Sequence, residues 1–109
     1  MKDLLKELVE TPGITGDERK VKNLIREKLE EHADSIEEDS LGNLIVRKGS
    51  GEKTLMLDAH MDQIGMAVER IDDDGFIRLT RVGGLFPTAM VNQQVTIFTD
   101  EGPIKGVIG

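Results

Sequence analysis

The chain has 109 residues, the size of one ordinary domain, and its 21 acidic and 14 basic side chains give a net charge of −7. This charge argues against nucleic acid and against an anionic membrane surface as partners, because both would repel it. The absence of cysteine excludes disulfides and thiolate metal ligands. No apolar run approaches the roughly 18 residues of a membrane span, and the N-terminus lacks a signal-peptide core. We therefore expect a cytoplasmic location.

Two helices are predicted first. Apolar side chains within residues 4–9 recur at helical spacing, and this helix should end before Pro12. A second helix is expected from about residue 16 to about residue 32, with Thr15 and Glu18 forming a capping box at its start. Its apolar stripe, which is typical of core packing, consists of Val21, Leu24, Ile25 and Leu29.

Short strands and polar turns follow the helices. Residues 35–39 and a strand that starts at residue 44 flank the turn Ser40–Asn43. The apolar run Thr54–Leu57 follows a polar, glycine-rich turn, and residues 54–60 are therefore predicted to form a central buried strand.

The pattern changes after residue 65, where helical periodicity ends. Residues 66–71 and 76–82 flank an acidic turn and predict a β-hairpin, and residues 91–98 and 103–108 predict a second one. The sequence thus predicts an α/β part over residues 1–65 and a β-rich part over residues 66–109.

The residues that are the clearest candidates for a metal-binding or catalytic role lie at the end of the predicted buried strand. Because a strand projects every second residue to one side, Asp58, His60 and Asp62 can point the same way. Either carboxylate can then hold one imidazole nitrogen while the other nitrogen faces outward, as a metal-binding histidine requires. A structural Asp–His hydrogen bond would show the same spacing, and one histidine with one aspartate does not complete a metal site.

Several segments, taken in order, resemble the glutamyl aminopeptidase and tetrahedral (TET) aminopeptidase family. Residues 59–65, A-H-M-D-Q-I-G, resemble the family segment A-H-M-D-E-I-G, with Gln63 where glutamate is usual. Residues 11–18 resemble its P-G-x-S-G-x-E opening, and residues 39–43 its D-x-L-G-N turn. Val82-Gly83-Gly84 and the last four residues are also similar to family segments. The resemblance runs the length of the chain.

The resemblance implies a dinuclear metallopeptidase that uses two divalent ions, zinc or cobalt, to remove N-terminal residues from peptides. It implies that His60 binds a metal ion and that Asp62 orients His60. Members of the family are much longer, and their other ligands and general base lie further along. We therefore expect the N-terminal part of a larger protein, whether a fragment or an interrupted gene product, that holds no stoichiometric metal and is inactive alone.

The resemblance also implies which domain of the whole protein each part belongs to. Residues 1–65 would be the N-terminal part of a mixed-sheet catalytic domain. Residues 66–109 would be the first strands of an inserted, barrel-like dimerisation domain. The intact enzyme would form homo-oligomers, with dimers assembling into a dodecamer.

Two other functions are compatible with parts of the sequence. A non-catalytic β-rich interaction module would explain the hairpins and the acidic surface, but not the placement of His60 and Asp62. An endoglucanase-type glycosidase would need two carboxylates at a set separation in a cleft, whereas most acidic residues here are predicted on helix faces or turns.

Overall fold

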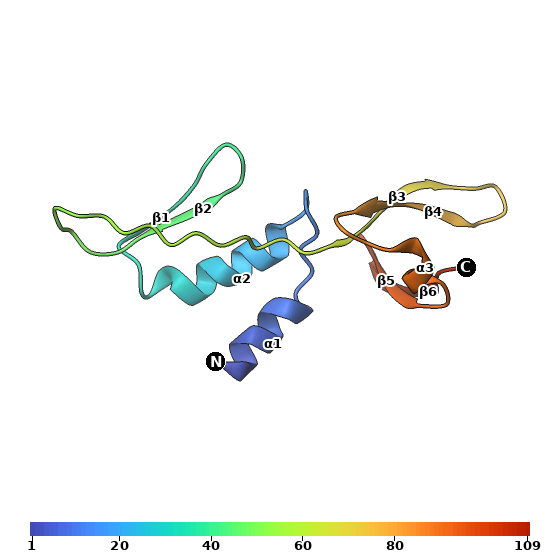
Figure 1. The fold of residues 1–109 in the computed structure, drawn as a ribbon, viewed down its shortest axis with the longest axis horizontal. Coiled ribbons are helices and arrows are strands. Elements are labelled where there is room, and N and C mark those ends of the chain that lie inside the picture. Colours follow the sequence, from blue (N-terminus) through green and yellow to red (C-terminus); the bar gives the residue numbers. More distant parts are fainter. The chain divides into compact units, whose positions relative to one another are not determined.

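A computed structural model describes all 109 residues and divides them into two compact units, Met1–Ile64 and Gly65–Gly109. The first unit contains the helices α1 (Lys2–Glu10) and α2 (Arg19–Glu30) and the strands β1 (Ser35–Glu38) and β2 (Leu44–Arg47). The second contains β3 (Gly65–Ile71), β4 (Ile77–Val82), the one-turn helix α3 (Pro87–Met90), β5 (Gln94–Thr99) and β6 (Gly102–Val107). The chain is thus mixed α/β, with its strands in three separate antiparallel pairs (Figure 1).

Helix α1 ends where the sequence predicts. Thr11 adopts an extended backbone with ψ of 124°, as a residue before proline prefers. Its hydroxyl and its amide both donate to the carbonyl oxygen of Glu7, at 2.7 Å and 3.1 Å. These two bonds satisfy a carbonyl that the helix leaves without an internal donor.

Helix α2 begins at Arg19, later than predicted, and the capping box at its start is wrong. Gly16 has a φ of +94°, a left-handed conformation that a right-handed helix cannot include. Glu18 does reach back, to the amide of Gly16 at 2.6 Å, but no side chain caps the helix. The Thr15 hydroxyl instead donates to the Asp62 carboxylate.

The β1–β2 hairpin closes around Asp39, as the turn residues predict. Asp39 Oδ1 accepts the amides of Leu41 and Asn43, both at 2.9 Å, and Oδ2 accepts the Asn43 side-chain amide at 2.8 Å. The Asn43 bonds lower the pKa of Asp39. Because the turn is held by local bonds, its residues alone were enough to predict it.

The first unit is joined mainly by polar contacts and has almost no apolar core. Val21 is its single buried hydrophobic side chain, at 3% exposure, and the rest of the α2 stripe is only half-buried. Lys28 of α2 pairs with Glu7 of α1 at 2.9 Å, and Lys22 and Arg26 both pair with Glu38 of β1. The predicted core packing therefore holds for one residue of the stripe.

The predicted buried strand over residues 54–60 is wrong. This segment is irregular and exposed, with 85% exposure at Leu55 and 89% at Leu57. A strand needs a neighbour to pair its backbone groups, and none of the three strand pairs includes this segment. Apolar sequence alone predicted burial here, but burial depends on partners that the run itself does not specify.

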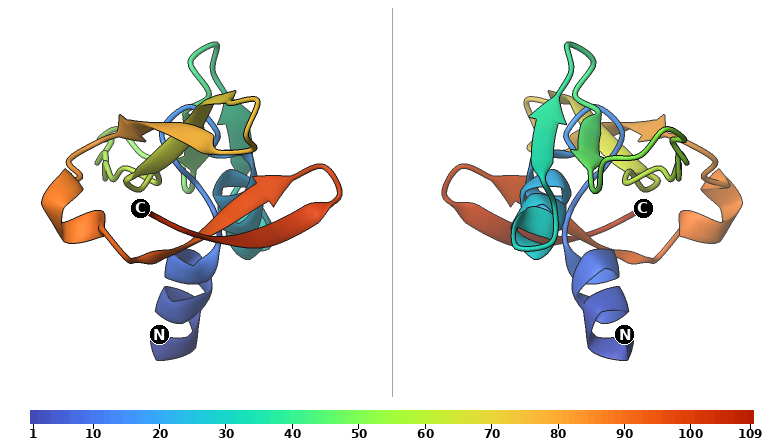
Figure 2. Two further views of the ribbon diagram at one scale, coloured as in Figure 1. Left: turned by 90° about the vertical axis from the view of Figure 1, so that its right-hand side faces the viewer. Right: turned by 90° about the vertical axis from the view of Figure 1, so that its left-hand side faces the viewer.

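Both predicted hairpins of the second unit are present. Strands β3 and β4 pair with a register shift between Val68 and Arg70, and β5 and β6 pair continuously from Gln94–Val107 to Thr99–Gly102. The β5–β6 pair is the orange-to-red ribbon of Figure 2. Helix α3 was not predicted, since a single four-residue turn that starts with proline shows no helical periodicity.

The first hairpin is fixed at its acidic turn by Asp72. This carboxylate accepts from Arg70 Nε at 3.0 Å and from Arg78 Nε at 2.6 Å, and these two bonds lower its pKa. Large apolar side chains of both hairpins remain exposed, among them Ile71, Phe76, Phe98 and Val107.

The longest helix, α2, has 12 residues, and none of the helices combines the length and apolarity that crossing a membrane requires.

Candidate functional site

The segment that carries His60 and Asp62 is fastened to the loop between α1 and α2. The Gln63 amide donates to the carbonyl oxygen of Gly13 at 2.8 Å, and Gln63 and Ile14 form an isolated parallel bridge. The Gln63 side-chain amide donates to the carbonyl oxygen of Thr11, also at 2.8 Å. These contacts span about fifty positions of sequence, so neither segment specifies them alone.

The loop that accepts these hydrogen bonds is packed closely against α2, through Gly13 and Val21. Gly13 is buried against Val21, so closely that a Cβ atom at Gly13 would lie 2.5 Å from Val21 Cγ1. The absence of a side chain is therefore what lets the loop approach α2. The loop in turn offers its carbonyl oxygens to Gln63.

His60 and Asp62 contact each other directly. The His60 Nδ1 atom lies 2.9 Å from Asp62 Oδ1 and 3.1 Å from the Asp62 carbonyl oxygen. The spacing left open which carboxylate, that of Asp58 or that of Asp62, would contact the ring, whereas the resemblance implied Asp62, and it is Asp62 that contacts Nδ1. Since the segment is irregular, the strand alternation expected to align all three side chains does not apply.

Thr15 completes the group from the other side. Its hydroxyl donates to Asp62 Oδ2 at 2.5 Å, while Oδ1 faces His60. These contacts, first that of Thr15 and then that of His60, lower the pKa of Asp62. At neutral pH Asp62 is therefore a carboxylate, which can only accept hydrogen bonds.

The protonation of the His60 ring follows from this. Because both acceptors near Nδ1 are oxygens, Nδ1 carries the proton in the neutral ring, and the lone pair is left on Nε2. The His60 side chain is 85% exposed, whereas that of Asp62 is 33% exposed. The arrangement presents an accessible, oriented nitrogen with the donor chemistry of a zinc or cobalt ligand.

His60 supplies one such ligand and no more. No group of three or more His, Cys, Asp or Glu side chains is arranged to hold a metal ion. The residues therefore fit one position of a metal site with its supporting carboxylate, and the remaining ligands would have to come from elsewhere.

The contacts of Thr15 with Asp62 and of Gln63 with the loop were not predicted from the sequence. Thr15 was interpreted as a helix cap, and Gln63 only as a departure from the family's glutamate. A hydroxyl at the position of the serine in the family opening was the available signal. What it contacts lies 47 residues away and could not be read from local spacing.

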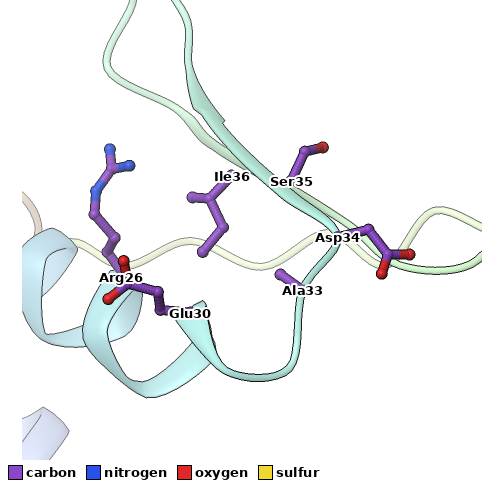
Figure 3. Close-up of a pocket in the computed structure, with 6 residues that line it drawn as sticks. All are labelled: Arg26, Glu30, Ala33, Asp34, Ser35 and Ile36. Carbon is purple, nitrogen blue, oxygen red and sulfur yellow. The ribbon is translucent and has the colours of Figure 1, made fainter.

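A hollow of about 270 Å³ lies elsewhere in this unit (Figure 3). It is lined by Arg26, Glu30, Ala33, Asp34, Ser35 and Ile36. Arg26 rises from α2 beside Ile36 of β1, whereas Asp34 points away from the hollow. The lining contains neither His60 nor Asp62, so the hollow is not the pocket of this group.

The chain is a mixed α/β segment that carries a His–Asp pair, and comparison with known proteins gives its family. Residues 42–109 match the M42 glutamyl aminopeptidase family. The chain belongs to this family.

Relatives and solved structures are similar to the chain over nearly its whole length. The chain is 39% identical to the lysyl aminopeptidase of Pyrococcus furiosus over 98% of its own length and 31% of that protein. The TET1 peptidase of Pyrococcus horikoshii superposes with a TM-score of 0.88 at 36% identity, over 98% of this chain and 32% of that one. A Thermotoga maritima protein described as an endoglucanase superposes with a TM-score of 0.84 at 38% identity, over 94% and 32%. The chain thus spans about a third of the length of these proteins.

Proposed function

We propose that the whole protein is a metal-dependent aminopeptidase that removes N-terminal residues from peptides. The observation that carries this proposal is the His60–Asp62 pair, in which Nδ1 contacts the carboxylate and the ring is exposed, within a chain of an aminopeptidase family. The aminopeptidase names of its relatives support the reaction class.

In the proposed enzyme His60 binds one of two divalent ions, zinc or cobalt, through Nε2. When bound, such ions would supply Lewis-acid chemistry for peptide hydrolysis. Asp62 keeps the proton on Nδ1 and fixes the ring plane, which makes His60 a stronger ligand. The general base and the other ligands lie outside these 109 residues.

The 109-residue chain alone is expected to be inactive and to hold no stoichiometric metal. A tight zinc site needs three or four protein ligands, and this chain arranges no such group. Elemental analysis of the purified chain after dialysis tests this. Two tightly bound metal ions per 12.0 kDa chain would contradict it.

We also propose a place for each unit in the whole protein. Residues 1–65 belong to the catalytic domain, and residues 66–109 supply the first strands of an inserted, barrel-like dimerisation domain. The change from helices to hairpins at Gly65 and the exposed apolar side chains of those hairpins support this. The TET1 peptidase of Pyrococcus horikoshii can assemble into a tetrahedron or a large octahedral shell, and the PhTET1-12s structure is a dodecamer. These assemblies support our proposal that the whole protein forms a dodecameric homo-oligomer. We propose a cytoplasmic location for it.

The glycosidase alternative is supported only by the description of the similar Thermotoga maritima protein as an endoglucanase. The hollow does include two carboxylates, Glu30 and Asp34, but Asp34 points away from it and accepts the amide of Gly49 at 2.5 Å. Glycoside hydrolysis needs both carboxylates to flank the same bond. The hollow therefore gives no support to the glycosidase alternative.

Replacement of each of the two histidines of the chain in the whole protein tests the proposal. His60→Ala should abolish both bound metal and hydrolysis of aminoacyl substrates, because it removes a ligand. His32→Ala is the matched control, because the His32 side chain is exposed and the residue accepts the hydrogen bond from Lys48 through its backbone carbonyl oxygen. This variant should preserve both the bound metal and the activity. Full metal content and activity in His60→Ala would refute the aminopeptidase proposal and favour the interaction module.

A further inference from the structure

We infer that Thr15 is a positioning residue for His60, acting through Asp62. This inference rests on the proposed function, since it assigns a further residue to the same site. The hydroxyl of Thr15 and the ring of His60 contact different oxygens of one carboxylate, Oδ2 and Oδ1.

The use of both oxygens is what gives the hydroxyl an effect at the ring. The terminal torsion of an aspartate is broad, so one hydrogen bond leaves the carboxylate plane free to turn. A second bond, to the other oxygen and from a different segment, restricts that rotation and keeps Oδ1 opposite Nδ1. The ring is 85% exposed, so few other contacts restrain its orientation.

A purely structural role would be redundant for Thr15. Its loop is already held by the Gln63 amide on Gly13, by the Gln63 side chain on Thr11, and by the packing of Gly13 on Val21. The bond from Thr15 adds a fourth attachment, and it alone ends on the carboxylate that contacts His60. Threonine suits this role because its branched Cβ restricts the rotation that aims the hydroxyl.

The test compares two threonines of the same loop. Thr15→Val removes the hydroxyl that reaches Asp62 and keeps the branched shape. Thr11→Val is the matched control, because the Thr11 hydroxyl binds only the carbonyl oxygen of Glu7 in its own helix end. Thr15→Ser restores a hydroxyl.

Two readouts are taken on the whole protein. The first is the ¹⁵N spectrum of the His60 ring in metal-free protein, which reports the fraction protonated on Nδ1. The second is the affinity for Zn²⁺ by competition with a chelator. We expect Thr15→Val to reduce the Nδ1-protonated fraction and to weaken Zn²⁺ binding by about tenfold, the lower end of the effect of such outer contacts. Thr15→Ser should recover both, and Thr11→Val should change neither.

An unchanged His60 spectrum in Thr15→Val would overturn the inference, as would equal changes in Thr15→Val and Thr11→Val. Thr15→Ala serves as a second variant should valine fail to pack, and failure of both to fold would show a role in folding instead of in positioning. If the unsubstituted protein binds no Zn²⁺, the proposed function fails, while the metal-free spectra still decide the role of Thr15.

Discussion

Gly13→Ala tests how tightly the loop that supports the site is packed. The added methyl group would lie 2.5 Å from Val21 Cγ1 and 3.2 Å from Val21 Cβ, so the loop or α2 must move. Overpacking of this kind typically costs about 1–3 kcal/mol. Gly13 does not have a left-handed backbone, so alanine returns about 0.4–1 kcal/mol by restricting the unfolded chain. The middle of the first range exceeds the middle of the second by about 1.3 kcal/mol, so we expect a net loss of local stability of about 1–2 kcal/mol.

Hydrogen exchange at the Gln63 amide measures this loss directly, because that amide donates to the carbonyl oxygen of Gly13. A loss of about 1–2 kcal/mol corresponds to exchange about 5–30 times faster. Gly84→Ala is the control, since a methyl group there meets nothing within 4 Å, and it should leave Gln63 unchanged. Adding Val21→Ala to Gly13→Ala removes the clashing Cγ1, so the two substitutions together should cost less than their sum.

Two results would refute the reasoning. One is an exchange rate at Gln63 that Gly13→Ala does not alter. The other is a Gln63 amide that is already unprotected in the unsubstituted chain, which would mean that the loop is not fastened at all.

Three further predictions concern the contacts around this loop and the hairpins. Gln63→Glu replaces the donor to the Thr11 carbonyl oxygen with a carboxylate, and should cost about 1 kcal/mol at neutral pH by amide exchange, with recovery in acid as the new side chain regains a proton. The folded-state pKa of Asp72 is lowered, so its contribution to the β3–β4 hairpin is present above the unfolded pKa of about 3.9 and is lost as pH falls through the lower folded value. Hairpin amide shifts followed from pH 6 to pH 2 should show this loss, and Asp72→Asn should abolish it. Gly42→Ala should destabilise the β1–β2 hairpin by about 1 kcal/mol in amide exchange, because Gly42 has a φ of +87°, a left-handed conformation in which alanine is strained. An added methyl would meet only ordinary contacts, so the loss comes from the backbone and not from a clash. Gly51→Ala should have little effect, because Gly51 has no positive φ.

The elements predicted correctly are those whose determinants are local. The hairpins of residues 65–82 and 94–107 and the turn at Asp39 are marked by turn residues whose bonds stay within a few positions. The buried strand over residues 54–60 failed because burial requires neighbouring strands, and an apolar run does not specify them. The start of α2 failed for a related reason, since the Thr15 hydroxyl expected to cap it binds a residue 47 positions away.

In the candidate site, too, contacts between residues close in sequence were predicted and contacts between distant residues were not. The spacing predicted a contact between His60 and Asp62, which the structure has, although the strand alternation behind that prediction does not apply. The spacing could not choose between Asp58 and Asp62 or find Thr15, because those depend on how the loop meets the segment. The metal-binding role of His60 and the orienting role of Asp62 remain predictions.

The His60 ring contacts Asp62, and the Asp62 carboxylate in turn contacts Thr15, all within the first unit. The position of the proton in the neutral ring is therefore specified by this chain. The number of ligands is not, because one histidine leaves most of a metal shell unfilled. In a chain that spans about a third of its relatives, the orientation of this candidate ligand can therefore be tested apart from the metal affinity of the whole protein.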